Sequence, residues 1–417
     1  MGRPVSVAMI VKDEAALLGD CLESIRSAAD EICVVDTGSR DETAAIARRF
    51  GAKIGEFAWC DDFAAARNAS LRLCTGDWIL VLDADERLTG VDCAKVRMLT
   101  SSPADCCYRI VTRTYTNAAS VSEFHPCRRG DPLNRGFAGW FPSWKIRLFP
   151  NHTGAVYRGK VHELIRPSLE EKGVRVVQSD VVIYHYPFLK NAEQIREKQV
   201  LYLRLGREKV RECPTDPNAC AELGRQYAEM GDYVGAMAAF REALRHEPDN
   251  ASLLKDLGGV LHLLGHGSAA EESLRLALKY DPENAEAWRN LGVIYAGREE
   301  WGSAVKCFSQ AVALDPQWVD GHRYLSLALD KSGRLEEAAQ AGRRAVEADP
   351  WSEQALSLFV DQMLRLNRRQ EVRETLEALA RSEEPPPLLV HILRSLAEDD
   401  SGLGNRAMSD AEPNPGR

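Results

Sequence analysis

Two carboxylates separated by one residue follow a strongly apolar run in the N-terminal half of the chain. Asp83 and Asp85 come directly after residues 78–82, five apolar residues that are typical of a buried strand. In an open α/β sheet, the carboxyl end of such a strand faces the crevice that holds ligands. A divalent cation bound together with a nucleotide diphosphate would compensate the paired negative charges. Alone, the tripeptide is more often an acidic turn, so the flanking residues decide.

The residues around this tripeptide alternate between strand and helix patterns. Short connections of this kind indicate βαβ units and a mostly parallel sheet. Ser39 and Glu42 have the spacing of a capping box that opens a helix reaching Phe50. The expected strands are 5–11, 31–36, 52–55 and 78–82, and the expected helices include 14–28 and 62–73.

Residues 105–189 change character and predict a mixed sheet edge with a lobe that faces the acceptor. Polar loops that contain Gly and Trp separate short strand patterns there. The expected strands are 108–111, 145–149, 161–165 and 181–184. Residues 1–189 are therefore expected to form one α/β domain.

An internal repeat with a step of 34 residues begins after residue 213. Four prolines keep this step, and Leu-Gly pairs and alanines recur in phase with them. One copy reads Trp288, Leu291, Gly292 and Tyr295, which is the tetratricopeptide signature. The four prolines are Pro248, Pro282, Pro316 and Pro350.

The repeat sets the expected organisation of the second half. Residues 190–212 predict a linker helix, and residues 213–398 predict an all-α solenoid of about four repeats. Residues 352–398 are expected to be a degenerate helical cap, and residues 399–417 a disordered tail.

Charge and composition exclude several classes of partner. Residues 1–189 carry 24 basic and 24 acidic residues, whereas residues 190–417 carry 29 basic and 38 acidic ones. Neither half therefore favours nucleic acid or an anionic membrane. No apolar run is long enough for a membrane span, no signal-peptide pattern opens the chain, and the 11 cysteines fit no disulfide or zinc pattern. We expect a cytoplasmic protein with reduced thiols.

Four segments in order resemble the family 2 glycosyltransferases with a GT-A fold. They are 9–14 (MIVKDE), 35–43 (VDTGSRDET), 66–68 (ARN) and 82–86 (LDADE). The resemblance implies an α/β GT-A domain, the nucleotide-diphospho-sugar transferase fold, followed by the all-α tetratricopeptide solenoid. It also implies inverting transfer from a nucleotide-sugar without a covalent sugar–enzyme intermediate.

From this resemblance, four residues are expected to bind the nucleotide. Val11 lies in the loop region that offers backbone groups to a base edge. Asp36 would accept the N3–H group of uracil, which favours UDP, and Arg67 would bind the diphosphate through its guanidinium. Asp83 would contact ribose or metal. The alternatives are a turn carboxylate for Asp36 and a surface arginine for Arg67.

Four further residues are expected to bind the metal or to take part in catalysis. Asp85 is expected to coordinate Mn²⁺ or Mg²⁺, with His185 as a further ligand unless it is a packed core histidine. Glu163 is our candidate general base, and His162 its neighbour or orienting residue. The alternative for both is a structural role at the end of a strand.

These inferences predict a metal-dependent glycosyltransferase of the hexosyltransferase type. Its donor would be a UDP-sugar, and its acceptor a peptide or protein presented by the repeats, which also bind a protein partner. Some bacterial relatives with this layout resemble peptide S-glycosyltransferases. The alternatives are a lipid-linked or surface-glycan acceptor, a repeat scaffold with an inactive transferase domain, and a nucleotidyltransferase. The last lacks its usual glycine-rich phosphate loop here.

Overall fold

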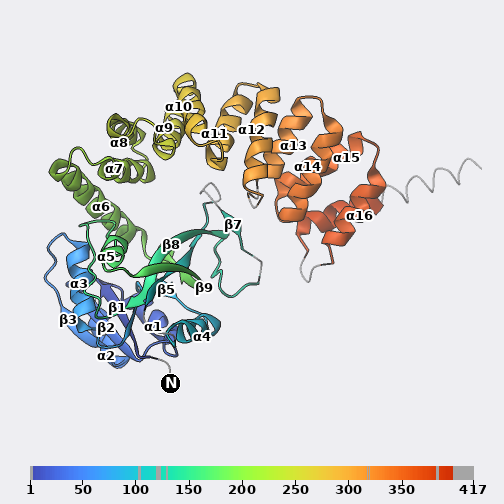
Figure 1. Cartoon of the computed structure of the whole chain (residues 1–417). Helices are drawn as coiled ribbons and strands as arrows, with labels where there is room; N and C mark the ends of the chain where they lie inside the picture. The colour runs from blue at the N-terminus through green and yellow to red at the C-terminus, as the bar shows by residue number, and fades with distance from the viewer. Residues whose placement is uncertain are drawn as a thin grey trace, which may run out of the picture. The chain divides into compact units, whose positions relative to one another are not determined.

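The computed structural model describes residues 3–101, 105–118, 124–127, 130–316, 318, 320–381 and 385–397. It divides into two compact units, Met1–Glu247 and Pro248–Arg417, which are described separately below (Figure 1). In the described residues, no helix is both long and apolar enough to cross a membrane. The expected tail at 399–417 lies outside the described residues, and the predicted domain boundaries stay a prediction.

A mixed β-sheet forms the centre of the first unit. Its strands run in the order β3-β2-β1-β4-β8-β6-β9-β5, and β7 pairs with β8. The strands are β1 (Val5–Val11), β2 (Glu31–Asp36), β3 (Lys53–Glu56), β4 (Trp78–Val81), β5 (Glu86–Arg87), β6 (Cys106–Thr116), β7 (His125–Pro126), β8 (Gly139–Pro150) and β9 (Arg175–His185).

The sheet has a parallel half and a mixed half, as the sequence predicts. Strands β3, β2, β1 and β4 pair in parallel, whereas β8 lies antiparallel to β4 and to β6. Helical connections on the parallel side explain this difference, because parallel neighbours need a crossover. The helices of this part are α1 (Ala15–Ser24), α2 (Thr43–Arg49), α3 (Phe63–Leu73), α4 (Gly90–Leu99), α5 (Arg166–Glu171) and the 3₁₀ helix η1 (Pro187–Leu189).

Strand β4 is apolar throughout because both faces of the sheet are covered. Trp78 and Leu80 pack in the cluster that holds residues of α1, α2 and α4. Ile79 and Val81 pack in a second cluster with residues of α3 and α5. All four side chains are at most 2% exposed. The α/β fold class is therefore confirmed.

Two local predictions are wrong. Helix α2 begins at Thr43 without a capping box, because the Ser39 hydroxyl instead accepts a hydrogen bond from the Asp13 N–H at 3.0 Å. Residues 161–165 form no strand but part of a reversing loop. Gly159 at φ +98° and His162 at φ +54° turn the chain there, and only an isolated bridge joins Arg158 to Leu164.

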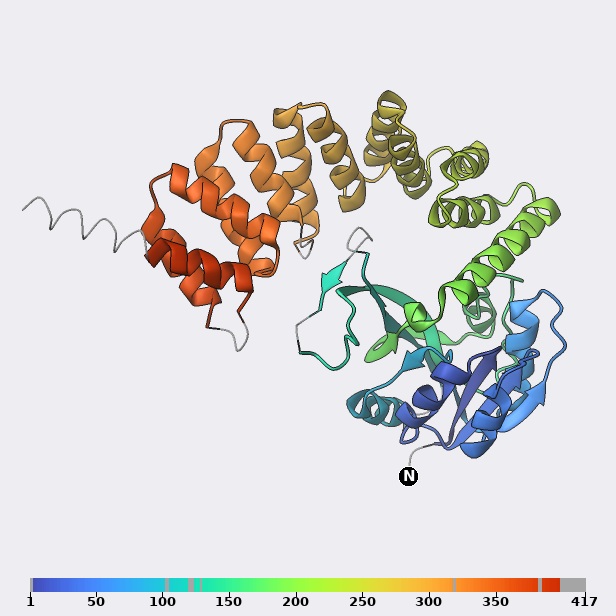
Figure 2. The same cartoon turned by 180° about the vertical axis from the view of Figure 1, so that it is seen from behind.

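The rest of the chain is helical. Helix α6 (Ala192–Glu212) starts with a capping box between Asn191 and Gln194, and two helices follow it in the first unit, α7 (Pro217–Glu229) and α8 (Tyr233–His246). Figure 2 shows the paired helices of the second unit stacked side by side. They are α9 (Ala251–Leu263), α10 (Gly267–Tyr280), α11 (Ala285–Gly297), α12 (Trp301–Leu314), α13 (Gly321–Lys331), α14 (Leu335–Ala348), α15 (Glu353–Arg365) and α16 (Arg369–Leu379).

The Leu-Gly step of the repeat has a packing cause. A Cβ atom at Gly292 of α11 would lie 2.6 Å from the Phe308 ring of α12, closer than real Cβ contacts. Gly224 meets Phe240 and Gly258 meets Leu274 in the same way. In these three pairs a bulky residue on the second helix therefore requires glycine on the first, which confirms the repeat.

Replacing Gly292 by alanine is expected to lower the free energy of unfolding by about 1–3 kcal/mol, because the added methyl group overpacks against Phe308. Differential scanning calorimetry of the full chain would measure the change. Gly297→Ala is the matched control in the same helix, since nothing lies within 4 Å of its Cβ position. Equal melting temperatures for the two variants would contradict this explanation of the repeat.

Candidate active site

The Asp83–Asp85 segment is a tight turn that reverses the chain at the carboxyl end of β4. The Asp83 N–H donates to Glu86 Oε2 at 2.9 Å, and the Glu86 N–H donates to the Asp83 carbonyl at 3.0 Å. Strand β5 then pairs antiparallel with β9, which sets Glu86 opposite His185. The turn therefore separates the two aspartates, and each carboxylate has its own partners.

Asp83 lies between two arginines. Arg67 Nη2 is 2.5 Å from Asp83 Oδ1, and Arg147 Nη1 is 3.8 Å from Oδ2. Arg147 also pairs with the buried carboxylate of Glu86 at 2.5 Å. Burial alone would raise the pKa of Asp83, but the two guanidinium groups hold it below the ordinary value of a carboxyl. Asp83 is therefore ionised at neutral pH.

Arg67 also reaches the candidate base. Its Nε donates to Glu163 Oε1 at 3.2 Å, so one guanidinium joins the β4 turn to the 158–164 loop. Arg67 is only 6% exposed, and its Nη1 is buried. One nitrogen of this guanidinium is therefore left without a hydrogen-bond partner among the described residues.

Helix α3 fixes Arg67 and the loop together. Asp62 caps its N-terminus by accepting from the Ala65 N–H at 2.8 Å. The amide of Asn68 donates to the Tyr157 carbonyl at 2.9 Å and accepts from its N–H at 2.8 Å. The sequence pair Arg67-Asn68 thus has two purposes, because its arginine enters the site and its asparagine holds the neighbouring chain.

His162 lies in the same loop, next to Glu163. Burial lowers its pKa below the ordinary value, so the imidazole is neutral near pH 7. Its ring lies 5.9 Å from the ring of Tyr202 on α6. Among the described residues no hydrogen bond joins His162 to Glu163, and its orienting role stays a prediction.

Asp85 faces a different set of groups. Lys190 Nζ lies 2.9 Å from its Oδ2, and His185 Nε2 lies 3.6 Å from its Oδ1. Lys190 also pairs with Glu14 at 2.5 Å, and His185 Nδ1 lies 3.1 Å from the Thr114 hydroxyl. Burial alone would raise the pKa of Asp85, but His185 and Lys190 hold it well below its usual range.

Asp85 and His185 fit a divalent cation that arrives with a phosphate ligand. In the described part of the chain, no cluster of three or more His, Cys, Asp or Glu side chains could hold an ion alone. Mn²⁺ and Mg²⁺ commonly take one or two protein donors and fill their other positions with phosphate oxygens and water. Such binding requires Lys190 to leave Oδ2, because the ammonium and the ion compete for one carboxylate oxygen.

The ends of β1 and β2 lie side by side at the same edge. Val11 is in register with Asp36, and the Val11 carbonyl accepts from both the N–H and the hydroxyl of Thr37. Asp36 Oδ1 accepts from the N–H groups of Gly38 and Ser39 at 3.0 and 2.8 Å. One oxygen of Asp36 thus holds the turn, and the nucleotide contacts of Val11 and Asp36 stay predictions.

Sequence reasoning missed two cations of the site. Arg147 lies between apolar neighbours on β8 and is 5% exposed. A basic residue within an apolar strand pattern is the sequence feature that could have indicated its place in the site. Lys190 follows η1 and belongs to no motif, so only the fold brings it to Asp85. Both cations offset carboxylates that the motif supplies.

Comparison with known proteins identifies the two parts of the chain. Residues 6–117 match the family model "Glycosyl transferase family 2". Residues 227–276, 264–317 and 295–352 match tetratricopeptide repeat models. The first match includes the turn that carries Asp83 and Asp85, and the others cover the helical pairs α8 to α14.

Several curated proteins are similar to parts of the chain. A TPR repeat-containing protein of Synechococcus elongatus is 35% identical over 56% of this chain and 54% of its own length. An uncharacterized glycosyltransferase of Rickettsia felis is 39% identical over 20% of this chain and 30% of its own. The SPbeta prophage-derived glycosyltransferase SunS of Bacillus subtilis is 24% identical over 53% of this chain and 49% of its own length. The chain thus spans about half or less of these relatives.

Some solved structures are similar to a part of the chain. A structure from a functional characterization of pilF from Pseudomonas aeruginosa covers 48% of this chain and 91% of its own, with 19% identity and a TM-score of 0.39. A crystal structure of MamA covers 38% of this chain and 92% of its own chain, with 18% identity and a TM-score of 0.36.

Replacing Lys190 by glutamine is expected to strengthen Mn²⁺ binding to the UDP-saturated protein by about tenfold, because it removes the ammonium that competes for Asp85. Isothermal titration calorimetry with MnCl₂ would measure the affinity. Lys95→Gln is the charge-matched control, since Lys95 pairs with Asp180 outside the site. Unchanged or weaker Mn²⁺ binding by Lys190→Gln would show that the ammonium does not compete with the ion.

Proposed function

We propose that this chain, in which a family 2 glycosyltransferase domain precedes tetratricopeptide repeats, transfers a sugar from a UDP-sugar to an acceptor. The transfer would proceed with inversion by single displacement and would depend on a divalent cation. One observation carries the proposal. Asp83 and Asp85 leave the same strand end but have separate cationic partners, which would let Arg67 bind a diphosphate while Asp85 ligates a cation.

The donor would lie along the carboxyl ends of β1, β2 and β4. Asp36 keeps one carboxylate oxygen outside its turn and would accept the uracil N3–H group. Arg67 would direct its unpaired Nη1 at a diphosphate oxygen, as guanidinium groups do in charge-assisted hydrogen bonds. Asp83 would hold that guanidinium in place and contact the ribose.

Asp85 and His185 would hold the cation, Mn²⁺ or Mg²⁺. When bound, the ion offsets the negative charge that develops on the departing diphosphate. The chain's own part in that stabilisation is electrostatic, because Arg67 and Arg147 already lie at the turn before any ligand arrives. Lys190 would then leave Asp85. It would pair either with a phosphate oxygen or with Glu14 alone.

Glu163 would take the proton from the acceptor as it attacks the sugar. Its side chain is 18% exposed, so it is reachable from solvent, and its bond from Arg67 Nε fixes one of its oxygens. The other oxygen would accept the proton of the acceptor. His162 lies beside it as a neutral imidazole and would shape the pocket without adding charge.

The acceptor would be a peptide or protein, and the sugar a hexose. The repeats support this choice, since stacked helical pairs offer extended surfaces to polypeptides. The similarity to SunS, whose name describes a glycosyltransferase, supports transfer but names no acceptor. A lipid-linked or surface glycan is the alternative acceptor.

Asp85→Asn is expected to abolish the Mn²⁺-dependent part of UDP binding, because the amide removes the charged oxygen that would ligate the ion. Isothermal titration with UDP, with and without Mn²⁺, measures this. Asp77→Asn is the control, since Asp77 lies just before β4, at the other end of the strand. If wild type itself shows no metal-dependent binding, the repeat-scaffold alternative is favoured. Equal affinities of Asp85→Asn and wild type would refute the ligand role.

Glu163→Gln is expected to lower sugar transfer at least about 100-fold while UDP binding stays nearly unchanged, because the amide can still accept from Arg67 but cannot take a proton. Hydrolysis and transfer would be followed with a panel of UDP- and GDP-sugars. Glu170→Gln on α5 is the surface control. Full turnover by Glu163→Gln would remove this residue as the base.

A further inference from the structure

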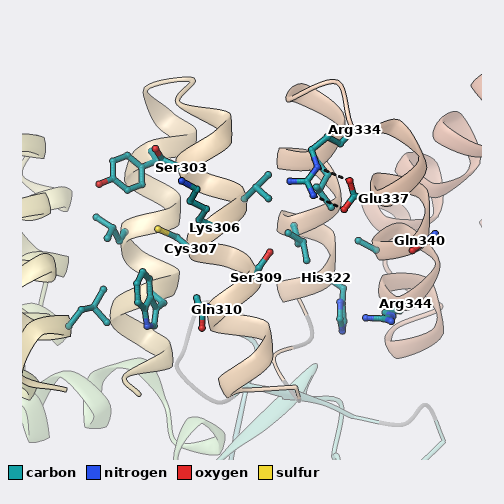
Figure 3. A pocket seen from close by; sticks show the side chains of 18 of the residues that line it. Ser303, Lys306, Cys307, Ser309, Gln310, His322, Arg334, Glu337, Gln340 and Arg344 are labelled. Atoms are coloured by element: carbon teal, nitrogen blue, oxygen red, sulfur yellow. Dashed lines mark hydrogen bonds and ion pairs between the residues drawn. The ribbon is translucent and has the colours of Figure 1, made fainter. Parts of the chain in front are cut away.

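A groove in the second unit is separate from the residues of the candidate active site. Residues of α10, α11, α12, α13 and α14 line it, and its volume is about 1010 Å³ (Figure 3). Apolar side chains from the first helices of two pairs lie in it, including Leu291, Tyr295 and Leu329, which are at most 5% exposed. Exposed polar side chains from the second helices surround them.

The charge of the groove is opposite to that of its surroundings. Residues 248–417 contain 19 basic and 28 acidic residues, so this unit is strongly acidic. The groove nevertheless contains five side chains of Lys and Arg and a single carboxylate, that of Glu337. Such a reversal concentrates positive potential in one place and favours an anionic ligand there.

Three of these cations have no acidic partner within the described ranges. Lys279 lies 5.8 Å from the centroid of the Tyr280 ring, and neither Lys306 nor Arg344 pairs with a carboxylate. The other two are compensated internally. Arg275 binds Glu271 and the Tyr295 hydroxyl, and Arg334 pairs with Glu337. The free cations come from α10, α12 and α14, so they are spread across successive helical pairs.

Neutral polar groups accompany the cations. Gln310 and Ser309 of α12 and Gln340 of α14 line the groove (Figure 3). His322 of α13 lies close to Arg344, and its Nδ1 is buried without a hydrogen-bond partner in the described residues. Amides and hydroxyls both donate and accept hydrogen bonds, so they match the N–H and C=O groups of an extended polypeptide.

We propose that this groove binds an extended acidic segment of a partner protein. Carboxylates of the segment would pair with Lys279, Lys306 and Arg344, its backbone with Gln310 and Gln340, and an apolar side chain would cover the floor. A polypeptide is favoured over nucleic acid because the unit as a whole is acidic and repels a densely charged polyanion. The proposal does not depend on glycosyl transfer, since the groove contains none of the residues assigned to it.

Fluorescence anisotropy with the full chain tests the proposal. The probe is a fluorescein-labelled peptide of Asp, Glu, Ser and Leu, compared with the same peptide carrying Asn and Gln in place of the acids. The acidic peptide is expected to bind, and to bind more weakly as salt is raised. The double variant Lys306→Glu/Arg344→Glu should lose at least about tenfold in affinity.

Lys331→Glu is the matched control for the single variant Lys306→Glu, because it makes the same charge change at an exposed position on α13 outside the groove. Lys306→Gln/Arg344→Gln repeats the test without introducing negative charge, and circular dichroism checks that each variant is folded. Equal binding of the two peptides, no binding of the acidic peptide, or equal loss in the control overturns the proposal. Tighter binding of a single-stranded oligo-dT through the same residues also overturns it, in favour of a nucleic-acid site.

Discussion

The guanidinium of Arg67 is the contact on which the arrangement of the candidate site depends. It binds Asp83 of the β4 turn and Glu163 of the 158–164 loop, two segments 80 residues apart in the sequence. Asn68, the next residue, holds the chain that leads into that loop. The position of one helix therefore sets the distance between the proposed diphosphate contact and the proposed base.

The two aspartates of the turn have different roles because their surroundings differ. Asp83 is neutralised by arginines, which are always charged and are suited to a diphosphate. Asp85 is neutralised by Lys190 and lies beside His185, groups that can give way to, or share, a cation. The site thus balances its carboxylates before any ligand is present, and a nucleotide with its ion would replace internal partners rather than create a new charge pair.

The sequence predicted the fold well where local patterns are strong. The run at 78–82 became β4, with alternate residues packed on opposite faces of the sheet. The 34-residue step became helical pairs, with Gly292 packed against Phe308. The prediction of a strand at 161–165 was wrong because two residues with positive φ turn this part of the chain into a loop. The prediction of a capping box at Ser39 was wrong because Ser39 instead accepts a hydrogen bond from Asp13.

The candidate site was predictable only in part. Motif residues at or just after strand ends, such as Asp36 and Asp83, lie at one edge because parallel strands end together. Arg147 and Lys190 are brought in by antiparallel pairing and by the chain after β9, which no local pattern encodes. Together with Arg67 and His185, which have the larger effects, their positive charges lower the pKa values of Asp83 and Asp85.

A crystal structure with UDP and Mn²⁺ tests the central claim most directly. The account predicts an anomalous manganese peak next to Asp85 and His185, the diphosphate against Arg67, and the uracil at Asp36. Lys190 would have moved away from Asp85 in that complex. Clear density for UDP at another place, or bound at this edge with no manganese next to Asp85, would contradict the account.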